Sequence, residues 1–342
     1  MMNLFRLLDR SSFSSEGLSD YFVETEKYEA GFANHYQQHL KEKVVRFEEA
    51  RLAALKNARR NLLISIPLFL LVPACAFGLP FVVQFEDYPV PFAFMAVFLS
   101  WSGLWWFVTR SLKMYQQSIK TEIFPNILSF VGDFAYSPQT NQSARQFEYS
   151  DIVPRFHRET SEDHIKGAYK GVDVELFESH LKRRKKTKKS TTYVTVFRGL
   201  FITLSMNKNF SGKTIVKRDA GKVGNWLQSS TQSLDKVRLE DPTFEKMFEV
   251  YSTDQIEARY LLTVTFMERL TELAGVFGGQ SIECCFDRNQ LLLKIPLKQN
   301  LFEPGSIFEP EDFIDDSKSL LKELNLIFSI VDILKLNMKI NL

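Results

Sequence analysis

Two long apolar segments dominate the hydropathy pattern of the chain. Residues 61–85 and 88–109 contain no charged side chain, and only Glu86 and Asp87 separate them. A helix rises 1.5 Å per residue, so each segment is long enough to cross a bilayer core of about 30 Å. The sequence therefore predicts two transmembrane helices that form a tight antiparallel hairpin. Their length disfavours the alternative of two buried helices in a soluble domain.

Basic residues are distributed unequally around this hairpin. Eight flank its two outer ends, namely Arg46, Arg51, Lys56, Arg59, Arg60, Arg110, Lys113 and Lys120, whereas the short link has none. Because Lys and Arg are enriched on the cytoplasmic side of membrane proteins, both termini are predicted in the cytoplasm. Neither span holds an ionisable group, so an anchor is favoured over a channel or transporter. A pore formed by several hairpins stays an alternative.

Helical periodicity extends on both sides of the hairpin. Apolar residues spaced three or four apart predict one long helix from Leu18 to Phe47, and a second from Leu112 to Val131 that bends at Pro125. Beyond them the pattern alternates with period two, which predicts strands within residues 165–181, 191–206, 213–217, 282–286 and 291–295. Helices are expected after Asp241, from Thr265, and through Leu320 to Leu334.

The predicted fold is α+β: a two-helix transmembrane hairpin with a cytoplasmic domain of antiparallel sheet covered by helices. Residues 1–60 form an N-terminal helical arm, 61–109 the hairpin, and 110–342 the α+β domain. The mean hydropathy of −0.15 resembles that of a soluble protein only because it averages the apolar hairpin with more polar flanks. With 43 basic and 41 acidic residues, the overall charge gives no reason to expect nucleic acid as a partner.

One dense basic cluster stands out between two predicted strands. It comprises Lys182, Arg183, Arg184, Lys185, Lys186, Lys188 and Lys189. Such a run repels itself and predicts a flexible hairpin tip. These residues are candidates for contact with anionic lipid, with a solvated loop as the plain alternative. Nucleic acid is disfavoured, because no aromatic residues interleave with the run.

Other patterns that carry chemistry are weak. His35 and His39 share a helix face but lack a third ligand and the acid of a zinc protease motif. Cys284 and Cys285 are neighbours on a predicted strand and point to opposite faces, so they are expected to be packing residues. Ser211-Gly212-Lys213-Thr214 imitates the end of a P-loop without its first Gly. No catalytic residue, cofactor-binding residue, metal ligand or cofactor is predicted.

Several stretches resemble one bacterial family. They are Phe197–Phe201 (FRGLF), Leu239–Pro242 (LEDP) with Phe244 and Phe248, Val250–Asp254 (VYSTD), and Glu257–Thr263 (EARYLLT) with Phe266–Glu268. These stretches and the two-span plan resemble the domain of unknown function family 3137, over roughly residues 120–342. Val264 departs from the expected Pro after Thr263, which leaves the local helix start open. The resemblance implies an uncharacterised bacterial membrane protein and supplies no reaction.

Taken together, these patterns favour an inner-membrane, multi-pass protein that presents its cytoplasmic domain as an interaction module. Its expected partners are another protein, a second copy of the chain, or anionic lipid. The alternative is a membrane-anchored enzyme with a site assembled from scattered residues such as Asp241, Asp254, Glu257 and Arg259. For those four residues, helix capping and surface ion pairs are the favoured roles.

Overall fold

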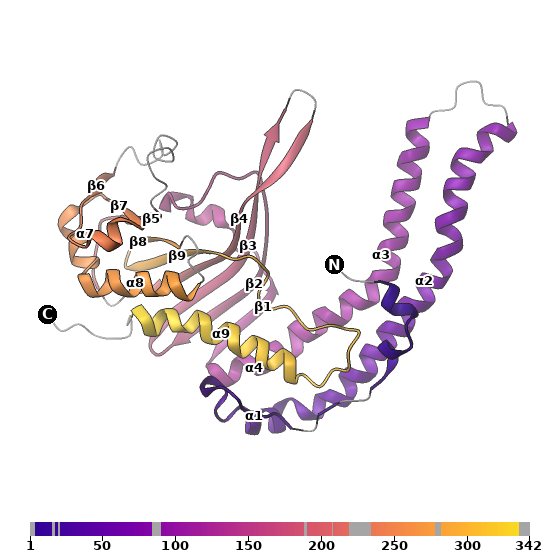
Figure 1. Ribbon diagram of the computed structural model, residues 1–342, viewed down its shortest axis with the longest axis horizontal. Coiled ribbons are helices and arrows are strands. Elements are labelled where there is room, and N and C mark those ends of the chain that lie inside the picture. The colour runs from indigo at the N-terminus through magenta and orange to yellow at the C-terminus, as the bar shows by residue number, and fades with distance from the viewer. Residues whose placement is uncertain are drawn as a thin grey trace. The chain divides into compact units, whose positions relative to one another are not determined.

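The computed structural model describes residues 4–15, 18–19, 21–83, 90–187, 190–206, 208–218, 234–277 and 282–334. They form two compact units (Figure 1). The first contains Met1–Asn126 and Pro304–Lys318, and the second contains Ile127–Glu303 and Ser319–Leu342. The division into arm, hairpin and domain at residues 60 and 109 stays a prediction.

The first unit is helical. Its elements are η1 (Leu4–Leu8), η2 (Ser11–Phe13), η3 (Lys27–Glu29), α1 (Phe32–His39), α2 (Lys41–Val83) and α3 (Val90–Glu122). Figure 1 shows α2 and α3 side by side, and their contacts run in antiparallel register. Asn61 Nδ2 donates to the carbonyl of Phe107 at 3.0 Å, and Trp101 Nε1 donates to the carbonyl of Phe69 at 3.2 Å. The predicted pair of apolar helices is therefore present as an antiparallel hairpin.

The single long helix predicted from Leu18 to Phe47 is wrong in its first half. Only α1 and the start of α2 are α-helical, and the chain before them is held in turns by carboxylates. The Glu24 carboxylate accepts hydrogen bonds from the N–H groups of Gly31 and Ala33, both at 2.9 Å. Gly31 takes a φ of +91° as the residue before α1, a conformation that glycine adopts without steric cost.

The prediction at Pro125 fits the structure. The helix α3 ends at Glu122 and α4 (Phe124–Val131) begins two residues later. Pro125 thus lies in the first turn of a new helix, where its missing N–H leaves no helical bond unmade.

The second unit contains a nine-stranded sheet. Its strands are β1 (Phe134–Gln139), β2 (Arg158–Tyr169), β3 (Val172–Lys186), β4 (Thr191–Ser205), β5 (Thr214–Arg218), β6 (Asp235–Val237), β7 (Phe248–Ser252), β8 (Glu283–Asp287) and β9 (Gln290–Pro296). Their order is β1-β2-β3-β4-β9-β8-β5-β7-β6. All neighbouring pairs are antiparallel. The predicted α+β class and antiparallel sheet are confirmed.

Helices pack on part of each face of this sheet. The remaining elements are η4 (Ala144–Ser150), α6 (Pro242–Glu245), α7 (Gln255–Leu261), α8 (Val264–Val276) and α9 (Ile314–Leu334). On one face Phe328 of α9 stacks on Phe134 of β1 with ring centroids 4.8 Å apart, and Phe266 of α8 meets Phe286 of β8 at 5.6 Å. On the other face Phe147 of η4 packs against the core of β3 and β4. Helices therefore cover the sheet, as the sequence predicts.

Candidate functional site

The hairpin helices expose most of their apolar surface. In the most apolar 18-residue window of the first candidate span only 11% of the helix is buried, and in that of the second 22%. Leu70 is 71% exposed and Phe98 is 70% exposed. Core helices of soluble proteins bury such side chains, whereas a bilayer solvates them. The helices are long and apolar enough to cross a membrane.

The basic cluster forms a strand where the sequence predicts a flexible tip. Strand β3 continues to Lys186, and its partners run from Thr195 opposite Lys182 to Thr191 opposite Lys186. The tip prediction is therefore wrong for Lys182, Arg183, Arg184, Lys185 and Lys186, and Lys188 and Lys189 lie outside the described residues. Cross-strand hydrogen bonding to β4 outweighs the repulsion between neighbouring charges, because alternate side chains point to opposite faces.

This part of the hairpin extends past its neighbours. The last pair between β2 and β3 is Arg158 with Lys182, so beyond Lys182 the β3–β4 pair is a two-stranded ribbon (Figure 1). The residues Arg183 to Lys186 are exposed, and none forms an ion pair with a described residue. The ribbon thus presents positive charge on both of its faces.

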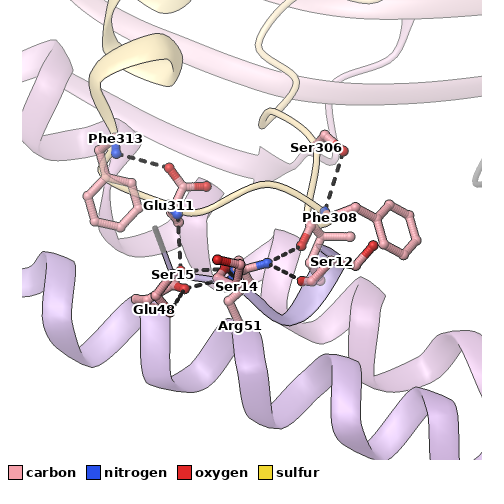
Figure 2. Close-up of polar contacts among 10 residues, drawn as sticks. Ser12, Ser14, Ser15, Glu48, Arg51, Ser306, Phe308, Glu311 and Phe313 are labelled. Carbon is pink, nitrogen blue, oxygen red and sulfur yellow. Dashed lines mark hydrogen bonds and ion pairs between the residues drawn. The ribbon is translucent and has the colours of Figure 1, made fainter. Parts of the chain in front are cut away.

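A buried arginine organises the first unit. Arg51 of α2 is 0% exposed, and all five of its guanidinium N–H donors have acceptors (Figure 2). It forms a bidentate pair with Glu48 at 2.6 and 2.7 Å, and donates to the carbonyls of Ser12, Ser14 and Ile307. The arginine therefore ties the N-terminal segment and the Pro304–Lys318 segment to α2.

The carboxylate of Glu48 accepts further hydrogen bonds besides those from Arg51. It accepts hydrogen bonds from the Ser15 hydroxyl at 2.6 Å and from the Glu311 N–H at 3.1 Å. Burial raises the pKa of Glu48, but hydrogen bonds from Arg51 and Ser15 outweigh it and the pKa is lowered. Sequence periodicity misses this network, because a charged pair three residues apart looks like any exposed helix pair.

Two further buried acids lie in the same unit. Burial, aided by the Asp316 charge, raises the pKa of Glu311 to about 8, and burial also raises that of Asp316 to about 6. The Asp316 carboxylate accepts from the Gly305 N–H at 2.6 Å, and that of Glu311 from the Phe313 N–H at 3.0 Å. Both groups hold the Pro304–Lys318 segment in shape through its backbone.

An acidic corner occupies one place in the second unit. Glu162, Asp163 and Glu303 bring carboxylate oxygens within 4.8 Å of one another, a donor set that suits a hard cation. The strand β2 bulges there and Asp163 takes a φ of +54°, which breaks the alternation that would separate neighbouring side chains. Asn300 donates to Glu162 at 3.0 Å and to Glu303 at 3.3 Å, so a neutral side chain already bridges the corner.

Beside this corner Glu178 is almost fully buried. It lies opposite Glu162 on the neighbouring strand and accepts a hydrogen bond from the Leu301 N–H at 3.0 Å. Burial raises the pKa of Glu178 to about 7. Its second oxygen lies 4.0 Å from Arg198 Nε. Arg198 in turn donates to the Asn300 side chain, so Asn300 links the guanidinium of Arg198 to the carboxylates of the acidic corner.

The residues considered for a scattered enzyme site have local structural roles. Asp241 caps α6 and Asp254 caps α7, each accepting from two backbone N–H groups. Glu257 accepts from the N–H groups of Ser211 and Gly212 at 2.8 and 2.6 Å, so a carboxylate fills the turn that imitates a P-loop. Arg259 donates back to a carbonyl of its own helix. Among the described residues, no hydrogen bond or ion pair joins the side chains of any two of these four residues.

His35 is half-buried and His39 exposed on α1, whereas Cys284 and Cys285 are buried in the sheet. His35 Nε2 lies 2.7 Å from the carbonyl of Asn126, and its ring is 4.5 Å from that of His39. Burial lowers the pKa of His35. Cys284 and Cys285 are 0% and 1% exposed, and burial raises both thiol pKa values, that of Cys285 to about 12. Inert thiols of this kind serve as small hydrophobic side chains.

A comparison with family models identifies much of the second unit. The model described as "Protein of unknown function (DUF3137)" matches residues 195–336. The resemblance read from the sequence is confirmed. The DUF3137 match starts within β4, later than the residue 120 expected from the sequence, and includes the FRGLF and EARYLLT stretches. In this DUF3137 segment Val264 is the first residue of α8 and Thr263 caps it, so the departure from Pro leaves the helix start intact.

Other comparisons add little. No curated protein matches the chain. Among solved structures, the crystal structure of the mycobacterial trehalose monomycolate transport factor A, TtfA, is similar at 13% identity, covering 62% of this chain and 93% of that chain with a TM-score of 0.33. A likeness at that TM-score says nothing about what this chain does.

Proposed function

We propose that the chain is a bacterial inner-membrane protein that presents its α+β unit to the cytoplasm as an interaction module. In this proposal α2 and α3 insert as a two-span hairpin with both termini cytoplasmic. The supporting observation is the exposure of the apolar hairpin surface, because side chains such as Leu70 and Phe98 are 71% and 70% exposed. A bilayer removes this surface from water.

Orientation and insertion can be tested separately. Carbonate extraction of bacterial membranes should leave the full chain in the pellet. A C-terminal tag should then be digested by protease in inverted vesicles and be protected in intact spheroplasts. Extraction into the supernatant would disprove insertion, and digestion in spheroplasts would disprove the orientation.

For the module itself we propose two kinds of partner. One is a protein, either a second copy or another chain, which in-membrane crosslinking followed by pull-down of the full chain would identify. Recovery of the uncrosslinked monomer alone at every crosslinker length would contradict this part of the proposal.

The second partner is anionic lipid, contacted by the basic cluster of Lys182, Arg183, Arg184, Lys185, Lys186, Lys188 and Lys189. Each Lys or Arg near an anionic surface contributes roughly 1 kcal/mol. Nucleic acid is the less favoured occupant because the chain is proposed to lie at a membrane. The ribbon charges that the structure describes form no ion pairs with described residues, which leaves them free to meet phosphate.

A fluorescent probe on the ribbon tests this contact in the full chain. A dye on Thr192→Cys, in a Cys75→Ser background and in phosphatidylglycerol nanodiscs, should be quenched by a headgroup-labelled lipid. Lys185→Gln with Lys186→Gln should reduce quenching. The control pair Lys246→Gln with Lys298→Gln removes two exposed charges elsewhere in the unit and should not. Equal quenching in all three proteins would refute ribbon contact.

A further inference from the structure

A groove lies where the apolar part of α2 begins. It has a volume of about 640 Å³ and lies between η2 and one face of α2 within the first unit. Its walls are formed by Phe13, Lys56, Arg59, Arg60, Leu63 and Ile64. Half of these residues are basic and half are apolar.

Helical spacing places the basic residues and the apolar residues of the groove at successive positions along the α2 axis. Lys56, Arg59 and Arg60 lie three or four positions apart, which places them on one face of α2. Leu63 and Ile64 follow on the same face one turn later, about 5 Å further along the helix. A cationic level therefore borders an apolar level at the start of the proposed span.

No described residue neutralises the cations of the groove. Among the described residues, no carboxylate forms an ion pair with Lys56, Arg59 or Arg60. Two other arginines of α2 do have carboxylate partners, because Arg51 forms an ion pair with Glu48 and Arg46 forms one with Glu122 at 2.5 Å. Three charges without a counter-ion among the described residues therefore line one groove, which favours binding of an anion.

Phe13 completes the apolar side. Its ring lies under the Arg59 guanidinium, with 5.4 Å between the guanidinium carbon and the ring centroid. A cation above an aromatic face is held in place without losing its charge. Leu63 and Ile64 are 52% and 51% exposed, so an acyl chain can lie along them.

We propose that this groove binds an anionic phospholipid. The phosphate meets Lys56, Arg59 and Arg60, and the first acyl carbons lie against Phe13, Leu63 and Ile64. The match is one of charge and polarity: an anion at the level of the headgroups and hydrocarbon just below it. The proposal rests on the insertion of α2 proposed above.

Native mass spectrometry of the detergent-solubilised full chain tests the site. Phosphatidylglycerol should bind with a defined stoichiometry and more tightly than phosphatidylcholine. Replacing Arg59→Gln together with Arg60→Gln should weaken phosphatidylglycerol binding about 25-fold, since each basic residue near anionic lipid contributes roughly fivefold. The pair Arg59→Lys with Arg60→Lys keeps the charge and should retain most of the binding.

The matched control removes two charges beside the groove without altering it. Arg110 and Lys113 of α3 are exposed, and neither lines the groove. They lie beside the same part of α2, because the hydroxyl of the intervening Ser111 donates to the Ala54 carbonyl at 3.1 Å. Arg110→Gln with Lys113→Gln should keep phosphatidylglycerol affinity within about twofold. An equal loss in both double variants would show a diffuse charge effect and overturn the site.

Two further outcomes separate this proposal from its premise. A chain that resists carbonate extraction but binds both lipids equally would overturn the groove and keep the membrane hairpin. Extraction of the chain would overturn the hairpin itself. Inorganic phosphate supplies the same anion without an acyl chain, so displacement of the lipid by an equal concentration of phosphate would also overturn the proposal.

Discussion

Arg51 and Glu48, one turn apart on α2, form a bidentate ion pair in which neither side chain has appreciable contact with water. Two charges taken out of water this completely are stable only when every remaining donor and acceptor is used. Three backbone carbonyls on Arg51, and a hydroxyl and an N–H on Glu48, meet that requirement. The ion pair is therefore stabilised by segments far apart in the sequence, and it holds those segments against α2 in return.

Removing the arginine should be costly. Arg51→Ala leaves the Glu48 carboxylate buried without its partner, and should destabilise the first unit by about 3–5 kcal/mol. Denaturant unfolding of the full chain in detergent, followed by limited proteolysis of the N-terminal segment, measures the loss. Arg46→Ala breaks an ion pair whose side chains are 61% and 48% exposed, and should cost less than about 1 kcal/mol. Similar losses of stability for the two variants would contradict a special stabilising role of the buried Arg51–Glu48 pair.

Glu178 should make the second unit less stable as the pH rises. Its pKa is about 7 in the folded chain against 4.5 for the ordinary carboxyl, so the folded state binds the proton more tightly. The stability gained from that proton is complete below pH 4.5 and is lost as the pH rises through 7. At pH 8 Glu178→Gln should exceed the natural chain in stability by up to about 3 kcal/mol, and the difference should vanish below pH 4.5.

Hydrogen exchange of β3 and β4 peptides in the full chain reports this difference. Glu175→Gln, on the same strand with a side chain 31% exposed, is the control and should follow the pH profile of the natural chain. Parallel profiles for Glu178→Gln and the natural chain would rule out a titrating group at this position.

Gly199 should not tolerate a side chain. It has a φ of +150° and lies opposite Pro296, where an added Cβ would collide with the Ile295 carbonyl and approach Pro296 Cα and Leu297 N at 2.8 Å. Gly199→Ala should destabilise the pairing of β4 with β9 by more than about 2 kcal/mol, seen as faster exchange in both strands. Gly275→Ala in α8 meets nothing within 4 Å and should be neutral or stabilising by up to about 1 kcal/mol. Unchanged exchange in Gly199→Ala would show that the backbone can relax there.

The thiols of the sheet should be unreactive in the folded chain. Cys284 and Cys285 are buried and burial raises their pKa values, so little thiolate forms and no reagent reaches it. In the Cys75→Ser background, iodoacetamide should modify neither residue until denaturant is added. Thr192→Cys, exposed on β4, is the positive control and should react at once. Rapid native labelling of either buried cysteine would contradict the packing of β8.

The sequence predicts some helices and strands correctly but misplaces their ends by a few residues. A helix in the 265–278 region is expected from apolar spacing, but its cap is Thr263 and not Thr265, because the Thr263 hydroxyl accepts from the Phe266 N–H. Strand β3 is expected to end at Leu181 and continues to Lys186. Composition alone assigns a basic run to a loop, whereas a paired neighbouring strand supplies hydrogen bonds that composition does not contain.

The sequence by itself determined what depends on near neighbours: two apolar helices of spanning length, the strands β3, β4, β5, β8 and β9 but not β1, β6 or β7, the caps at Asp241 and Asp254, and the resemblance to a family of unknown function. Tertiary structure decided what depends on distant partners. The carbonyls of Ser12 and Ile307 reach Arg51, Asn300 bridges Glu162 and Glu303, and Phe13 closes the basic groove on α2. Hydropathy and charge patterns have periods of a few residues, so they encode the first set. The second arises only when folding brings separate segments together.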